Sequence, residues 1–229
     1  MKYALLLAVL IASPALAAER GLTLTDFDRV RVEGPYVVDV TSGKSASGKL
    51  IGTPQAFDRI TVQVQDHTLV IRPNRSGWGG NPDTDGGPVR VKITVPVLRT
   101  AWVNGSGVVT IAGMRGATLD LVLQGSGSLS VSAIQADRLS VGLTGAGSAT
   151  VSGKASQVTI TTRGGGALDA SALATQDIKV SSEGSGDVKA TASRSAKVTS
   201  SGAGNIVVAG KPACIVSNVG AGSVVCGAK

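Results

Sequence analysis

Residues Gln124–Gly147, QGSGSLSVSAIQADRLSVGLTGAG, contain the motif that decides the fold. Gly125-Ser126-Gly127 stands near the start of this stretch, and Gly145-Ala146-Gly147 ends it. The same Gly-x-Gly motif recurs through the C-terminal half at steps of 18 to 20 residues, with first glycines at Gly105, Gly125, Gly145, Gly164, Gly184, Gly202 and Gly220. Recurrence at a nearly fixed step indicates a structural repeat.

Apolar residues alternate with polar ones on both sides of each motif. Leu119, Leu121 and Leu123 precede Gly125, and Leu129 and Val131 follow it, all at a period of two. The residues between them are mostly Ser, Thr, Gln, Lys and Asp. This period predicts strands with one buried face. Each unit is therefore a strand, a glycine corner, a second strand and a short return.

Neither strand of a unit can bury its apolar face alone, so the units must stack. A row of antiparallel hairpins remains an alternative, because periodicity does not reveal chain direction. Recurrence of the same residue type at the same position favours stacking of coils. We predict an all-β fold, a right-handed parallel β-helix-like solenoid with Gly-x-Gly corners and about seven coils of 18–20 residues over 101–226.

The corner glycines are expected to have positive φ, or to lie where a side chain cannot fit between stacked backbones. A phosphate-binding loop is disfavoured, because that loop joins a strand to a helix and occurs once. Residues 27–100 lack the repeat. We predict varied strands there, at 36–40, 60–64, 69–71 and 89–95, with a hairpin turn at 65–68, and expect them to cap the solenoid.

The first residues, MKYALLLAVLIASPALA, resemble a secretory signal over 1–17, with cleavage before Ala18. We therefore expect a single exported β domain over 18–229, in the periplasm in the simplest case and otherwise at the cell surface or outside the cell. No later segment is apolar enough to predict a transmembrane span.

The chain has 22 basic and 15 acidic residues, and removing Lys2 leaves 21 and 15, a net charge of +6. These charges are spread thinly, which is typical of a solvated surface, with weak binding to anionic lipid or polysaccharide surfaces as the sharper alternative. Nucleic acid is not an expected partner, because no platform of aromatic and arginine residues accompanies the charge.

Cys214 and Cys226 lie six residues before and six after Gly220. These are the inward positions that hold Leu119 and Val131 around Gly125. If each corner folds the coil into two facing walls, the two cysteines can oppose each other across the core. In an oxidising compartment we predict a disulfide there.

We predict no catalytic residue, no metal site and no cofactor. His67, the only histidine, falls in the expected turn at 65–68, and one histidine with two oxidised cysteines cannot bind zinc. Residues 81–86, NPDTDG, match half of a calcium loop, but Lys92 stands where the late glutamate is needed.

Two further features of the sequence each have two interpretations. Trp78 and Trp102 are the aromatic candidates for carbohydrate binding, although Trp102 alternates with Val103 and could be partly core. Two residues before the later corners the apolar residues give way to Thr162, Ser182, Ser200 and Asn218. A hydrogen-bonded ladder is the expected reading of these residues, and a binding strip is the alternative.

The stretches FDRVRVEGPYVVDV (27–40), LVIRP (69–73), VKITVP (91–96) and VNGSGVVTI (103–111), with serial glycine corners, resemble the GIN domain family. That family carries the label of an autotransporter adhesin head domain in exported bacterial envelope proteins. The resemblance covers nearly all of 27–225, and implies a β-helix-like fold without catalytic residues.

From these observations we expect a non-enzymatic exported envelope protein, an adhesin-like binding or structural β-solenoid. Its partner would be an envelope protein or a polysaccharide. The alternative is a glycan-binding or glycan-processing β-helix protein.

Overall fold

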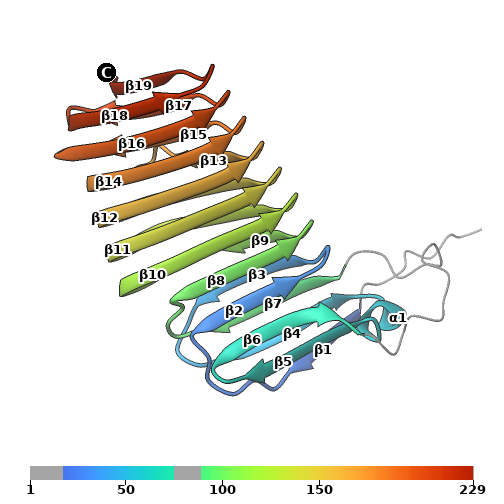
Figure 1. Cartoon of the computed structure of the whole chain (residues 1–229). Helices are drawn as coiled ribbons and strands as arrows, with labels where there is room; N and C mark the ends of the chain where they lie inside the picture. Colours follow the sequence, from blue (N-terminus) through green and yellow to red (C-terminus); the bar gives the residue numbers. More distant parts are fainter. Residues whose placement is uncertain (1–17, 75–88, 229) are drawn as a thin grey trace, which may run out of the picture.

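The computed structural model describes residues 18–74 and 89–228, whose strands stack as rungs from the N-terminal strands to the C terminus (Figure 1). The expected signal segment at 1–17, Trp78 and the calcium-like stretch at 81–86 lie outside these residues. Within the described part, no helix is long and apolar enough to cross a membrane.

Each rung of the solenoid consists of one strand before a glycine corner and one after it. Before the corner, forming the first wall, come β8 (Thr100–Gly105), β10 (Met114–Gly125), β11 (Ser128–Gly145), β12 (Ser148–Gly164), β14 (Leu173–Gly184), β16 (Ser195–Gly202) and β18 (Ala213–Val219). After the corner, forming the second wall, come β9 (Val108–Ile111), the initial parts of β11 and β12, β13 (Ala167–Ala170), β15 (Val188–Ala192), β17 (Ile206–Gly210) and β19 (Val224–Ala228).

Neighbouring rungs pair in parallel from β8 and β9 to β18 and β19, so the predicted solenoid is confirmed and the hairpin alternative is wrong. The corner glycines stack in register, as the pairs Gly105 with Gly125 and Gly125 with Gly145 illustrate. The seven corners from Gly105 to Gly220 are separated by six steps, which gives a solenoid of about six turns.

The core is a set of aliphatic columns between the two walls. One column contains Leu119, Leu139, Val158, Ile178 and Ala196, which succeed one another in register and are all buried. A fully buried leucine or isoleucine stabilises the fold by about 1.5–3 kcal/mol relative to an exposed one. Such columns need no aromatic residues, which accounts for the aromatic content of 3%.

Polar residues replace the aliphatic ones at one core position. Thr162, Ser182 and Ser200 are only 3–4% exposed, and the Thr162 hydroxyl donates a hydrogen bond to Ser182 Oγ at 2.9 Å. The ladder is confirmed between these two residues, while burial contradicts the binding-strip alternative. Asn218, in the last rung, is exposed and instead donates to the carbonyl of Gly222 at 2.8 Å.

This hydrogen bond leads to a test by a double-mutant cycle. Ser182→Ala leaves the buried Thr162 hydroxyl without its acceptor, at an expected cost of about 1–2 kcal/mol. Thr162→Val combined with Ser182→Ala removes both partners, and should recover most of that loss. Urea unfolding of the two single variants and the double variant measures the coupling. Additive losses would contradict a stabilising pair.

The N-terminal region contributes two rungs that are out of chain order. β2 (Arg29–Glu33) and β3 (Val37–Ser42) pair in parallel with β8 and β9. On their other side they pair in parallel with β6 (Thr68–Pro73) and β7 (Arg90–Val95). β2 and β3 therefore lie between strands that follow them in the sequence, and region 27–100 extends the solenoid as well as capping it.

Antiparallel strands close the N-terminal end. β5 (Ile60–Gln65) pairs with β6, β4 (Ser47–Gly52) with β7, and β1 (Ala18–Leu22) with β4. The four-residue helix α1 (Pro54–Phe57) joins β4 to β5. The hairpin turn predicted at 65–68 is confirmed, with positive φ at Asp66 and His67.

Candidate binding groove

A third, shorter ladder carries the chain from the second wall back to the first. We call it the return face, made of residues 114–117, 134–137, 153–156 and 173–176. In it Arg115, Gln135, Lys154 and Ala174 stack in register on successive rungs. Met114, Ile134 and Leu173 are buried on its inner side, which ties the return face to the core.

Backbone conformation makes the return face irregular. Ala133 has a φ of 53°, and the ladder between β11 and β12 shifts register between Val131 and Ile134. Gly153 has a φ of 130°, and a Cβ there would lie 2.3 Å from the carbonyl oxygen of Ile134. An extra residue in one rung and a required glycine in the next thus bend this face away from a flat ladder.

The bent face contains a groove of about 750 Å³. Its floor consists of small residues, among them Gly116, Ala136 and Ala155. Arg115 and Lys154 line one side of it and are exposed. The rest of the lining is polar or small: Gln135, Asp137, Ser156, Ala174, Thr175, Gln176, Thr191 and Ser193. A second hollow of about 310 Å³ shares Asp137, Ser156 and Gln176 with the groove.

The polar groups at the end of the groove nearer the C terminus are held in place by hydrogen bonds. Ser193 Oγ donates to the carbonyl of Thr175 at 3.1 Å, and Thr191 Oγ1 donates to the carbonyl of Ser171 at 2.8 Å. The Thr175 hydroxyl donates to the carbonyl of Ser156 at 3.4 Å. These contacts position the lining residues before any ligand arrives.

Charge near the groove divides into paired and unpaired groups. Arg194 forms a two-contact ion pair with Asp177, with Nε 2.8 Å from Oδ1, and Ser195 Oγ donates to the same oxygen at 2.7 Å. The Arg194 and Ser195 hydrogen bonds lower the pKa of Asp177 to about 2. Among the described residues, Arg115 and Lys154 make no ion pair, so the groove retains positive charge.

The residues singled out in the sequence lie elsewhere. His67 is in the β5–β6 turn, and Trp102 lies on the outer surface of the first wall, 37% exposed. The expectation that Trp102 could be partly core was wrong, because outward residues of β2 and β8 stack, and the Arg31 guanidinium lies 4.8 Å from the Trp102 ring centre. In the described part of the chain, no group of three or more His, Cys, Asp or Glu residues could hold a metal.

The corner glycines allow the backbone to turn and to form hydrogen bonds between successive corners. Gly125 has a φ of 110°, and the carbonyl of Gly105 accepts hydrogen bonds from the amides of Ser126 at 3.1 Å and Gly127 at 2.9 Å. The corresponding corner amides at 146–147, 165–166, 185–186 and 203–204 bind the rung below in the same way. These amides are therefore not available to cradle a phosphate.

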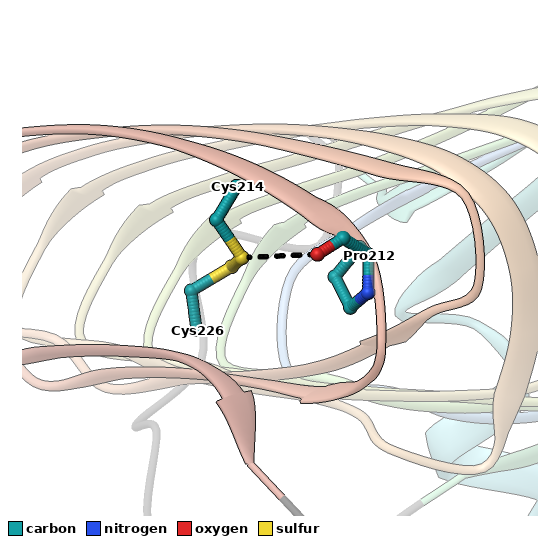
Figure 2. The surroundings of a disulfide bond; sticks show 3 residues. All are labelled: Pro212, Cys214 and Cys226. Carbon is teal, nitrogen blue, oxygen red and sulfur yellow. Dashed lines mark hydrogen bonds between the residues drawn. A yellow bond between two sulfur atoms is a disulfide. The ribbon is translucent and has the colours of Figure 1, made fainter.

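The disulfide between Cys214 and Cys226 is confirmed, with Cα atoms 6.3 Å apart. Cys214 continues the column of Leu119, and Cys226 that of Val131, so the bond spans the two walls of the last rung (Figure 2). Cys214 Sγ also lies 3.5 Å from the carbonyl oxygen of Pro212. A disulfide sulfur has no proton to donate, so we regard this as a van der Waals contact.

Sequence reasoning missed the groove residues Arg115, Gln135, Lys154 and Gln176. They lie in the returns, where alternation breaks down and where the length of the unit varies. The spacing between corner glycines shortens from 20 residues to 19 between Gly145 and Gly164. This shortening was the signal available in the sequence, because it marks the place where the ladder between β11 and β12 shifts register.

Comparisons with known proteins give the same fold. A family model described as "putative auto-transporter adhesin, head GIN domain" matches residues 26–212. A crystal structure of a putative adhesin from Bacteroides fragilis NCTC 9343 superposes with a TM-score of 0.84 at 23% identity, covering 91% of this chain and 95% of that chain.

Two structures from Parabacteroides are also similar. A putative lipid binding protein from Parabacteroides distasonis ATCC 8503 has a TM-score of 0.68 at 21% identity, covering 91% of this chain and 96% of that one. A putative adhesin from Parabacteroides merdae ATCC 43184 has a TM-score of 0.64 at 18% identity, with 91% and 95% covered. A search of curated proteins found no match. At these identities the likeness concerns the fold alone.

Proposed function

Because the chain belongs to the family described as "putative auto-transporter adhesin, head GIN domain", we propose that it is an exported, non-enzymatic binding protein. Its ligand is an acidic polysaccharide of a cell envelope, bound in the groove of the return face. The observation that carries the proposal is the positively charged, hydroxyl- and amide-lined groove that runs across several rungs.

The shape of the groove suits an extended polymer. Arg115 and Lys154 lie in one column two rungs apart, a spacing of about 9.6 Å at the usual 4.8 Å between strands. Gln135 lies between them in the same column. Two cations separated by an amide can hold successive anionic groups of a chain that lies along the solenoid axis, while the floor of Gly116 and Ala155 leaves room for its backbone.

The lining disfavours a lipid tail as the ligand. The apolar residues of the groove are only glycine and alanine, whereas sites for apolar ligands are lined mainly by larger aliphatic and aromatic side chains. The name of the Parabacteroides distasonis neighbour therefore does not transfer to this groove. Weak attraction of the +6 chain to anionic vesicles would be an effect of overall charge, which salt screens.

The carboxyl groups favour binding over hydrolysis. Glycosidases generally use two carboxyl groups, one with a raised pKa, on either side of the bond they cleave. The described lining of the groove contains one carboxylate, Asp137. The pKa values of Asp169 and Asp177 are both lowered, by hydrogen bonds from Ser171 and from Arg194 respectively. Neither group is thereby suited to act as a general acid at neutral pH.

Export is supported by two features of the chain. Residues 1–17 have the pattern of a secretory signal, and the Cys214–Cys226 disulfide is the kind of bond that persists in oxidising compartments. We place the protein in the bacterial periplasm or at the cell surface, where envelope polysaccharides are accessible.

Binding can be tested with polygalacturonate as the acidic polymer and dextran as the neutral one. We expect the protein to bind polygalacturonate and not dextran at 0.15 M salt, by isothermal titration calorimetry. The Arg115→Ala/Lys154→Ala variant should bind about tenfold more weakly, equivalent to about 1.4 kcal/mol. Both side chains are exposed, so the fold should be unchanged.

The matched control is Lys179→Ala/Lys197→Ala, which removes the same charge from neighbouring positions on the outer first wall. This control should bind within about twofold of the wild type, a difference of about 0.4 kcal/mol. Equal losses in both variants would show attraction to overall charge and contradict a groove site. Release of unsaturated or reducing sugar products from the polymer would contradict the non-enzymatic assignment.

A further inference from the structure

Exposed apolar residues gather on the last rung of the solenoid. Ile215, Val216, Val219 and Val225 are 68%, 44%, 70% and 48% exposed, and they are four of the seven large hydrophobic residues exposed in the described part of the chain. On the rung below, the register partners of Ile215 and Val219 are Lys197 and Ser201. Residues 213–228 contain no charged side chain.

Both strands of this rung also have a free edge. β18 pairs with β16, and β19 with β17, and no strand among the described residues pairs with their outer edges. Soluble proteins usually protect such edges with lysine, proline, bulges or a covering segment. In the part of the chain that the structure describes, the only irregularity of this rung is a register shift near the end of β19, and no segment covers the outer edge of β18.

The N-terminal end of the solenoid is built differently. There the first wall ends at β5, whereas the second wall continues through β4 to β1, so the two walls end unevenly. The outermost strand, β1, carries Glu19 and Arg20, and Glu19 forms an ion pair with Lys49. Charge and an uneven edge disfavour stacking of another solenoid on this end.

The disulfide holds the last two strands, β18 and β19, in a fixed relative position. It joins β18 to β19 across the core, so the last strands of the two walls are covalently linked (Figure 2). A partner that satisfies both edges must present two antiparallel strands at the same separation. A single extended peptide cannot do this, but the same end of a second copy can. Because 213–228 contain no charged side chain, pairing β18 and β19 with their counterparts brings no like charges directly opposite each other.

We propose that the C-terminal end of the solenoid, β18 and β19, binds the same end of a second copy in a two-fold dimer. A two-fold axis normal to the walls reverses strand direction, so each β18 would meet its counterpart in antiparallel pairing, and each β19 likewise. Strands of equal length are matched, and the apolar interior becomes continuous through the junction. This surface is independent of the groove on the return face.

The contact surface between the two ends is small, and its size limits the expected affinity of the dimer. Residues 213–228 offer fewer contacts than the roughly 20–30 residues per side of a standard interface. The stapled strands lose little conformational freedom on association, which offsets part of that deficit. We therefore expect a dissociation constant in the micromolar range, about −8 kcal/mol.

Sedimentation velocity of the purified, oxidised protein tests the dimer. Between about 1 and 200 μM, a range that brackets a micromolar dissociation constant, the wild type should shift from monomer to dimer. Small-angle scattering should show a dimer about twice as long as the monomer and no wider, because a two-fold junction at one end closes the assembly. Ile215→Lys/Val219→Lys brings like charges together across the junction and should remain monomeric.

The control is Ser201→Lys, which adds one lysine one rung below Val219 and should dimerise like the wild type. Thermal melts should show all three proteins folded, because the substituted side chains are exposed. A wild type that stays monomeric throughout the range overturns the proposal. So does equal dimerisation of the double-lysine variant, a side-by-side particle, or open-ended growth beyond the dimer.

Discussion

Gly125→Val is expected to destabilise the protein by about 4 kcal/mol, the largest effect of any single substitution considered. A β-branched residue at a φ of 110° is strained by about 1–3 kcal/mol. A Cβ would also lie 2.5 Å from the carbonyl oxygen of Gly105, and relieving that overlap costs about 1–3 kcal/mol more. The melting temperature should fall by about 8–16 °C, as measured by circular dichroism.

Ser126→Ala is the matched control, because it lies in the same corner but is exposed. Only the amide of Ser126 contacts the Gly105 carbonyl, and alanine keeps that amide. Its effect should stay within about 0.5 kcal/mol. Equal melting temperatures for Gly125→Val and Ser126→Ala would overturn the steric account of the corners.

Removal of the disulfide should produce the second-largest effect, but a local one. The bond closes a loop with a sequence separation of 12, and such a loop contributes about 2–3 kcal/mol. In Cys214→Ala/Cys226→Ala, amide hydrogen exchange in 206–226 should accelerate by about 30- to 150-fold. Each rung contacts only its neighbours, so exchange in β10 should not change.

Reduction of the wild-type disulfide provides the control, because it breaks the bond without changing side-chain size. The reduced wild type and the double-alanine variant should give the same exchange pattern. Unchanged protection of β18 in both samples would mean that the strand ladder to β16 holds the end without help from the disulfide.

Much of this architecture could be predicted from the sequence. The period of two around Gly125 fixes which side chains face inward, and the repeated step fixes which residues stack. Together they place Cys214 above Leu119 and Cys226 above Val131, which the strand register confirms. Stacking of like residues also favoured parallel over antiparallel rungs, because only coils in register bring equivalent positions together.

The N-terminal rungs could not be predicted in the same way. The corner of β2 and β3 is Gly34-Pro35-Tyr36, which lacks the second glycine of the motif. Gly34 nevertheless has a φ of 107° and lies beneath Gly105. Its strands pair with residues far along the chain, as Val30 does with Leu69 and Ala101. Sequence periodicity reports only contacts between adjacent units, so such distant pairings leave no periodic signal.

The groove escaped prediction because its residues share no pattern. Arg115, Gln135 and Lys154 occupy one column, but they differ in type and follow returns of different length. Burial constrains the inner side of each rung and produces the alternation. The outer side of a return is in contact with solvent, so packing places no periodic demand on it.

The out-of-order rungs determine how the molecule responds to a pulling force at its C terminus. As the chain unravels from its C terminus, each first-wall strand from β18 to β8 becomes the terminal strand in turn. A terminal strand is paired with only one neighbour, so the rungs can detach one after another. The next strand along the chain, β7, is different, since it is paired on one edge with β3 and on the other with β4. Extracting it requires two ladders to break at once. A force applied at the C terminus should therefore detach the rungs one at a time and meet a higher resistance when it reaches β7.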